Sequence, residues 1–430
     1  MRASPPTSRV ADPVLHRAPQ APVLIIGGGI GGLTLALSLH QAGVPCRVFE
    51  AAPAVKTLGV GVNLLPHGMR ELTELGLQER LAKIAVETQE LCFYNRYGQF
   101  IFKEARGRRA GYEWPQLSIH RADLHEVLLE AVRERLGVDS VVLNMKFSSL
   151  QEEQGGVRAK FDNGVSVVGS CAIGCDGIHS AVRKMLFPGE GPPAYQGINM
   201  WRGVTRMKPF LSGASMAVAG WLEIGKMVIY PIRKDLDAEG RQLINWVAEI
   251  QSPRNVMQDW NLGGKIEDFY PTFENWRFDW LDCAALIRNA DQVLEYPMVD
   301  RDPLPYWTKG RVTLLGDAAH PMYPRGSNGA GQAILDARTL AGCIRRSADI
   351  EVALKDYEMA RLKAANDLVL MNRANPPDAI LREVWRRSGD RPYANIEDVI
   401  SNAELVAMSE AYKRVAGFER ASLAQRGSLV

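Results

Sequence analysis

Three glycines near the beginning of the chain, Gly27, Gly29 and Gly32, have the spacing G-x-G-x-x-G. Glycine at these positions permits a tight turn, the close approach of a pyrophosphate, and the packing of a helix on a strand. An apolar run precedes the motif, and a helical stretch, Leu33–Gln41, follows it. Glu50 stands eighteen positions after the last glycine, where a carboxylate can bind a ribose hydroxyl. The pattern predicts a βαβ unit that binds a dinucleotide, with helix amides facing its phosphates.

Two later segments end a short apolar run with an acid next to a glycine. The segment 171–183 contains Asp176 before a glycine, and the segment 312–332 contains Asp317 directly after Gly316. Each run is typical of a buried strand that leads into a helix. We expect the three strands to share one sheet, which brings both acids beside the glycine-rich turn.

The three motifs, in this order and at this spacing, resemble those of the single-component flavoprotein aromatic hydroxylases, the class A monooxygenases. The resemblance extends from about Pro22 to Asn375 and implies an FAD-dependent enzyme that takes electrons from NADH or NADPH. Such an enzyme hydroxylates an aromatic or heteroaromatic ring with dioxygen, through a flavin C4a-hydroperoxide. The protein has to bind FAD, position the ring and exclude water, so no nucleophilic triad is expected. Within the family, a likeness to phenazine-carboxylate monooxygenases is carried by Leu58–Asn63, Ser118–Arg121, Met200–Thr205 and Tyr296–Pro305.

The resemblance implies a set of cofactor-binding residues. Glu50 is expected to bind the adenosine ribose, and Arg121 to reach the FAD pyrophosphate rather than to cap a solvated helix. Asp317 is expected at the ribityl chain or beside the pyrophosphate. Asp176 is linked in the family to FAD and NAD(P)H, although a hydrogen bond to Arg183 or to a loop would also explain it. The full set is Gly27, Gly29, Ile30, Gly31, Gly32, Glu50, Ala51, Val60, Gly61, Arg121, Asp176, Gly316, Asp317, Asn328, Gly329 and Ala330.

Two of these groups should face the flavin ring. A helix that opens at Asn328–Ala330 would point its amides at the ring and stabilise negative charge on the reduced flavin. The segment 59–63 matches the family loop beside the flavin, where glycines at alternate positions let the backbone approach the ring.

The candidates for the substrate site are Arg202, Tyr230, Pro321 and Arg325. Pro321 follows His320, a residue that more often shapes such a turn than acts as a base. Tyr230 either lines the pocket or packs in the core. A guanidinium at Arg202 or Arg325 can bind a carboxylate or a phenolate, or can pair with a surface acid. Arg325 replaces an apolar residue of the phenazine enzyme's pattern, so the substrate does not follow from the resemblance.

The motifs imply an α/β fold with a discontinuous, Rossmann-like FAD-binding domain, an inserted β-sheet substrate domain and a C-terminal helical region. Apolar periodicity predicts helices over 333–345 and 350–373. Seven of the nine tryptophans lie between Trp201 and Trp307, where they either pack the back of a sheet or line a pocket for a flat ring. The expected boundaries are 1–21 for a disordered N-terminal arm, 22–81, 105–188 and 285–375 for the FAD-binding domain, 82–104 and 189–284 for the substrate domain, and 376–430 for the tail.

Composition and the remaining motifs exclude several classes of function. A net charge of +2 offers no basic field for nucleic acid, the apolar runs are too short for a membrane span, and the six scattered cysteines complete no metal site. The first twenty residues have no apolar signal core, so we expect a cytoplasmic protein. A disulfide reductase or a Baeyer–Villiger enzyme needs a second G-x-G-x-x-G, which the sequence lacks. Oxidative decarboxylation, epoxidation and a non-catalytic flavin redox sensor remain open, as do a monomer and a homodimer.

Overall fold

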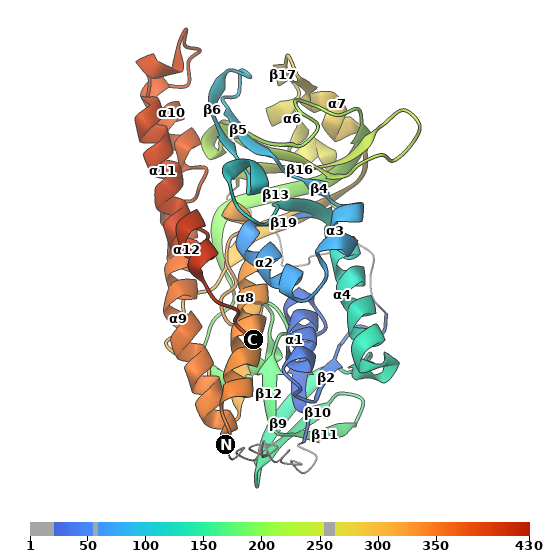
Figure 1. Cartoon of the computed structure of the whole chain (residues 1–430). Helices are drawn as coiled ribbons and strands as arrows, with labels where there is room; N and C mark the ends of the chain where they lie inside the picture. The colour runs from blue at the N-terminus through green and yellow to red at the C-terminus, as the bar shows by residue number, and fades with distance from the viewer. Residues whose placement is uncertain (1–20, 55–58, 253–262) are drawn as a thin grey trace, which may run out of the picture.

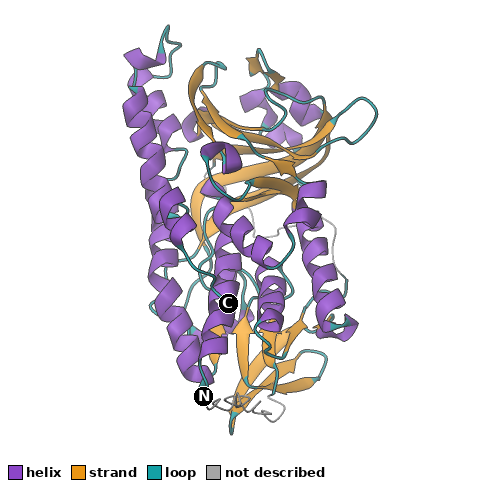
Figure 2. Ribbon diagram, viewed as in Figure 1, coloured by secondary structure: helices purple, strands orange, loops and turns teal. Residues whose placement is uncertain are grey.

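A five-stranded parallel sheet forms one half of the computed structural model, which describes residues 21–54, 59–252 and 263–430 (Figures 1 and 2). The fully buried strand β1 pairs with β2 on one side and with β12 on the other. The glycine-rich turn and the Asp176 segment therefore leave the sheet at the same edge, as the sequence predicts. The spatial order is β20 (Val312–Leu314), β12 (Cys171–Gly174), β1 (Val23–Ile26), β2 (Cys46–Phe49) and β8 (Val141–Val142).

Three helices cover this parallel sheet. The helix after the glycine-rich turn, α1 (Ile30–Gln41), packs against α4 (Arg121–Leu136) and α8 (Gly329–Arg346). A long helix, α9 (Ile350–Ala374), packs on α8 and begins where the Asp349 side chain accepts hydrogen bonds from the amides of the first turn. An antiparallel sheet contacts β1 and β12; its strands are β9 (Phe147–Glu153), β10 (Gly156–Phe161) and β11 (Ser166–Gly169).

A seven-stranded mixed sheet forms the other half. Among its described strands, only β5 and β14 are parallel neighbours. The segment 290–300, which we assigned to the FAD-binding domain, forms an edge strand here, because β19 pairs with β13 over most of its length. The spatial order is β19 (Ala290–Asp300), β13 (Ala194–Met207), β16 (Gln242–Gln251), β15 (Gly225–Arg233), β14 (Ser215–Trp221), β5 (Glu90–Tyr94) and β6 (Phe100–Ala105).

The two faces of this sheet have different chemistry. Trp201 and Trp246 lie on the back face, where they stack or pack against Phe269. Their neighbours Arg202 and Asn245 point to the front face, as strand alternation requires. Of the two roles open for the tryptophans, packing is the one seen in the described residues, while Trp260 lies outside them.

Shorter elements connect the two halves. A three-stranded sheet of β3 (Gly61–Leu64), β7 (Leu117–His120) and β4 (Val86–Glu87) contacts β15. The hairpin of β17 (Arg277–Phe278) and β18 (Leu281–Asp282) closes the back of the large sheet. The remaining helices of the body are α2 (Pro66–Glu74), α3 (Gln78–Ile84), α5 (Ala181–Leu186), α6 (Tyr270–Phe273) and α7 (Cys283–Arg288).

The C-terminal tail is helical, as expected, and returns to the body of the molecule along α9 (Figure 1). Its last residues dock on α2, because the Arg70 guanidinium donates to the carbonyls of Arg426 and Gly427, and Arg426 pairs with Glu71. The tail helices are α10 (Ala379–Ser388), α11 (Asn402–Val415) and α12 (Arg420–Gln425).

Two further expectations concern an N-terminal arm and a membrane-spanning helix. The predicted N-terminal arm lies almost entirely outside the described residues. Among the helices of the described segments, none is both long and apolar enough to cross a membrane.

Candidate active site

The glycine-rich turn has two structural glycines and one that faces open space. Gly27 has a φ of +112°, and a Cβ on Gly32 would overlap the Gly27 carbonyl oxygen, so both positions require glycine. A Cβ on Gly29 would meet no described atom within 4 Å. The φ of Gly29, −75°, is also one that any residue can adopt. Gly29 precedes the first amides of α1, which lack partners within the helix. The turn therefore leaves room for an anionic group at the helix N-terminus.

Glu50 stands over this turn at the end of β2. Its carboxylate accepts hydrogen bonds from the amides of Gly28 (2.7 Å) and Ala52 (2.9 Å), which hold it beside the open space. A carboxylate has further lone pairs for ribose hydroxyls. His125 of α4 makes a 2.7 Å hydrogen bond with the Gly28 carbonyl, a contact that the sequence did not predict.

The acid of the third motif and the arginine of α4 lie near one another. Asp317 is exposed, and a Cβ on Gly329 would lie 3.9 Å from its Oδ1. Arg121 is also exposed, and its guanidinium makes no hydrogen bond or ion pair with the described residues. The surrounding protein reduces the hydration of the Asp317 carboxyl and thereby raises its pKa. The positive charges of His320 and Arg121 oppose this change. Asp317, Gly329 and Arg121 thus surround one region next to the turn at Gly29.

A buried ion pair fixes the turn that carries Asp317. His320 Nε2 lies 2.6 Å from Asp336 Oδ2, and the Gly316 amide donates to the same oxygen. Burial opposes ionisation of Asp336, but the charges of His320 and Arg361 outweigh it and lower the pKa to about 2. His320 thus shapes the turn, in agreement with the favoured interpretation. Pro321 is buried and does not line the cavity described below.

Asp176 caps a helix. Its carboxylate accepts from the Ser180 hydroxyl (2.5 Å) and from the amides of Ala181 and Val182 at the start of α5. Burial raises the pKa of Asp176, against these hydrogen bonds. Arg183 does not pair with Asp176, because its guanidinium binds Glu190. The hydrogen bond to Arg183 that we considered is therefore absent from the described residues, and a role of Asp176 at FAD or NAD(P)H stays a prediction.

The loop at Gly61 is held by the large sheet. Its amide donates to Asn245 Oδ1 (2.6 Å), and its carbonyl accepts from Arg202 Nη2 (2.9 Å). A Cβ on Gly61 would lie 2.7 Å from Tyr230 Cε2, so the loop requires glycine here. The Val60 carbonyl accepts from the Arg121 amide, which joins this loop to α4. Burial raises the pKa of Tyr230, against the nearby charge of Arg202. Arg202 and Tyr230 therefore position the loop.

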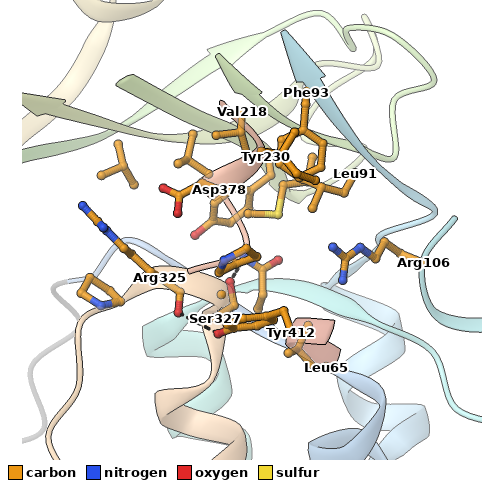
Figure 3. A pocket seen from close by; sticks show the side chains of 18 of the residues that line it. Leu65, Leu91, Phe93, Arg106, Val218, Tyr230, Arg325, Ser327, Asp378 and Tyr412 are labelled. Carbon is orange, nitrogen blue, oxygen red and sulfur yellow. Dashed lines mark hydrogen bonds between the residues drawn. The ribbon is translucent and has the colours of Figure 1, made fainter. Parts of the chain in front are cut away.

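A cavity with an empty volume of about 1000 Å³ opens between the front face of the large sheet, the turn before α8 and the C-terminal tail (Figure 3). Arg202 and Tyr230 also face it. Its aromatic side chains include Phe93 and Tyr412, and no described tryptophan contributes. The apolar wall on the sheet side consists of Leu91, Phe93, Met200, Met216, Val218, Val228 and Val247. A flat, apolar ring system fits such a wall.

Arg325 lines the cavity without a hydrogen bond or ion pair to an acid of the described residues. The residue is 8% exposed, and its Nε and Nη2 make no hydrogen bond with any described residue. A nearby lysine, Lys226, is already paired: its ammonium binds Asp378 and lies 2.8 Å from Glu249 Oε2. Burial opposes ionisation of Asp378, but the charges of Lys226 and Arg325 outweigh it and lower the pKa of this carboxyl. The surface ion pair that we considered for Arg325 is absent from the described residues.

The comparisons with known proteins agree with this geometry. A family model described as FAD binding domain matches residues 20–205 and 298–371. The chain belongs to this family. A phenazine 1,6-dicarboxylic acid hydroxylase of Lysobacter antibioticus is 40% identical over 411 residues, which cover 93% of this chain and 98% of that enzyme. A 3-amino-4-hydroxybenzoate 2-monooxygenase of Streptomyces cremeus is 33% identical and covers 79% of this chain and 83% of its own length.

Solved structures share the fold. Klebsiella pneumoniae HpxO, complexed with FAD and uric acid, superposes with a TM-score of 0.75 over 96% of this chain and 99% of its own, at 23% identity. The predicted class of flavoprotein hydroxylase is confirmed, and a phenazine hydroxylase is among the relatives. The more specific likeness, to the 5-methylphenazine-1-carboxylate 1-monooxygenase of the pyocyanin pathway, stays a prediction. This FAD-binding family member is therefore an FAD-dependent aromatic-ring monooxygenase, with NADH or NADPH as electron donor.

The observed site fits FAD. The open space at Gly29 suits a pyrophosphate, and Arg121 and Asp317 offer unpartnered charges along the same edge of the sheet. Sequence reasoning missed Asn245 and the tail residue Tyr412. The polar alternation of β16 could have revealed Asn245, whereas the tail carries no motif that points to Tyr412.

Proposed function

We propose that this monooxygenase hydroxylates a planar, carboxylated heteroaromatic compound whose carboxylate binds Arg325. The observation that carries the proposal is the nearly buried guanidinium with two unpartnered nitrogens in an apolar cavity. A buried charge without a partner is costly, and a substrate carboxylate would offset that cost through a bidentate pair. The phenazine dicarboxylic acid named for the Lysobacter relative belongs to this chemical class.

The residues of the chain have separate tasks in such a reaction. FAD, when bound, supplies the activation of dioxygen. Arg325 orients the substrate by its carboxylate, and the apolar wall holds the ring and excludes water. Arg202 and Asn245 keep the Gly61 loop in place beside the flavin site. The first amides of α8 would stabilise negative charge on the reduced ring.

A substrate screen tests this function. We would measure NADH and NADPH consumption with phenazine-1,6-dicarboxylate, phenazine-1-carboxylate, its carboxamide and unsubstituted phenazine. We expect the acids to stimulate consumption and to gain one oxygen atom from labelled dioxygen. Oxygen that came from water would contradict the proposal, and so would equal rates with acid and carboxamide. A product that has lost carbon dioxide would favour oxidative decarboxylation instead.

A further inference from the structure

We infer that the cavity contains a second anion-binding subsite, at Arg106, and that its preferred ligand is a flat aromatic dianion with acidic groups on opposite edges. The inference rests on the proposed function, because it assumes that the first acidic group binds Arg325. Arg106 follows the end of β6, and Arg325 lies in the turn before α8. Figure 3 shows the two side chains at opposite sides of the cavity, with the guanidinium of Arg106 directed into it.

The charges that line the cavity do not balance. Three carboxylates face five cationic side chains, which leaves an excess of two positive charges. The cations are Arg106, Arg202, Lys226, Arg325 and Lys413, and the carboxylates are Glu104, Glu249 and Asp378. Such an excess in a mostly apolar cavity favours an anionic ligand, because the cationic side chains are only partly compensated there.

At the Arg106 side, two cations share one carboxylate of the cavity. Glu104 accepts from Arg106 and from the Ser409 hydroxyl, and it lies 3.1 Å from Lys413 Nζ. Lys413 also pairs with Glu410, but that carboxylate is 46% exposed and does not line the cavity. Exposed ion pairs contribute little, so Glu410 compensates this side only weakly.

Arg106 keeps donors available although it is paired with Glu104. Its side chain is 12% exposed, and Nε makes no hydrogen bond within residues 21–54, 59–252 and 263–430. Gln116, which also lines the cavity, has a buried Oε1 without a partner and an amide that can turn to donate to an anion. A second carboxylate of the ligand would bind Arg106, while the first carboxylate binds Arg325 at the other side of the cavity.

The test compares the dicarboxylate, the monocarboxylate and the neutral parent of one ring system. Binding to the FAD-loaded enzyme is followed by the change in flavin absorbance. In the wild type we expect the dicarboxylate to bind about ten- to a hundredfold more tightly than the monocarboxylate, since a charge-assisted hydrogen bond is added. In Arg106→Met this advantage should disappear, while the affinity for the monocarboxylate changes less than about threefold.

A matched variant controls for net charge. Arg108 lies two residues further along, is 48% exposed and pairs with Glu87 outside the cavity, so Arg108→Met should keep the preference for the dicarboxylate. The inference is overturned if the second carboxylate brings no gain in the wild type, or if Arg106→Met weakens both acids equally. If the wild type neither binds nor hydroxylates any acid of the series, the proposed function itself fails. If the monocarboxylate is hydroxylated and the dicarboxylate binds no more tightly than it does, only the Arg106 subsite is contradicted.

Discussion

The hydroxyl of Tyr412 accepts a 2.7 Å hydrogen bond from the side-chain amide of Asn328, although the two residues lie 84 positions apart. The same hydroxyl donates to Asn372 Oδ1 at 2.8 Å, and all three side chains are buried. Asn328 caps α8, and the turn before it contains Gly326 with a φ of +73°, on which the Tyr412 ring packs so closely that a Cβ would overlap it. A tail helix thus fixes the turn that carries Arg325 and leads into α8, the helix that we expect to face the flavin.

Tyr412→Phe removes this hydroxyl and takes one buried hydrogen bond each from Asn328 and Asn372, which keep their bonds to the carbonyls of Gly326 and Tyr323. We expect the FAD-loaded enzyme to lose about 1–3 kcal/mol in its free energy of unfolding. Urea titration of the variant measures the loss, and FAD titration of the apoprotein shows whether binding weakens with it. Tyr97→Phe is the control, since the hydroxyl of that exposed tyrosine also hydrogen-bonds a tail residue. An equal loss in both variants would contradict a special role of Tyr412.

The sequence was sufficient where a local motif determines the backbone. The turn at Gly27, the helix after it and the acid at Glu50 could be predicted because each depends on residues close in the chain. The predicted helices over 333–345 and 350–373 lie within α8 and α9, because apolar periodicity marks a buried helix face.

Long-range pairing could not be predicted in the same way. β19 belongs to the large sheet because it pairs with β13. The two strands are far apart in the sequence, so no local motif indicates that they pair. The same holds for the place of Tyr412 beside Asn328, since the tail matches no motif. For Arg325 the sequence allowed either an ion pair with a surface acid or a position in the substrate cavity. The packing of the tail distinguishes these two alternatives.

Arg325→Met should separate charged from neutral substrates. We expect the KM for a carboxylated substrate to rise about tenfold or more, as a charge-assisted hydrogen bond of about 1.5–3 kcal/mol is lost. The KM for the corresponding carboxamide should change little. Arg325→Lys keeps the charge without the planar fork and should fall between the two. Steady-state kinetics with both analogues checks this, and equal effects on acid and amide would make Arg325 structural.

Gly29→Val should abolish FAD binding without unfolding the protein. A side chain there occupies the space in front of α1 that a pyrophosphate needs, but its Cβ would meet no described atom within 4 Å and the backbone is unstrained. Gly32→Val is the contrast, because its Cβ would overlap the Gly27 carbonyl and disturb the βαβ unit itself. Circular dichroism and the flavin content of the purified variants distinguish these effects. Full FAD occupancy in Gly29→Val would refute the site assignment.

His67, at the start of α2, makes stability depend on pH. The side chain is fully buried, neither ring nitrogen has a hydrogen-bond partner in the described part of the chain, and the ring stacks on Phe418. Burial, with the charges of Arg426 and Arg361, lowers the pKa of His67 from 6.5 to about 3. Between these two values the unfolded chain binds a proton that the folded protein does not. This residue therefore lowers the free energy of unfolding as the pH falls below about 6.5, with a slope of up to about 1.4 kcal/mol per pH unit.

Replacing His67 by leucine should remove this contribution. The free energy of unfolding of His67→Leu, minus that of the wild type, should grow as the pH is lowered from 7 to 5, since only the wild type gains the extra proton on unfolding. Urea titrations at saturating FAD measure the difference at each pH. His67→Asn, which is polar but does not titrate, should show the same pH dependence despite a different packing cost. If the stabilities of wild type and both variants change in parallel with pH, His67 does not titrate on unfolding and its burial has no pH-linked cost.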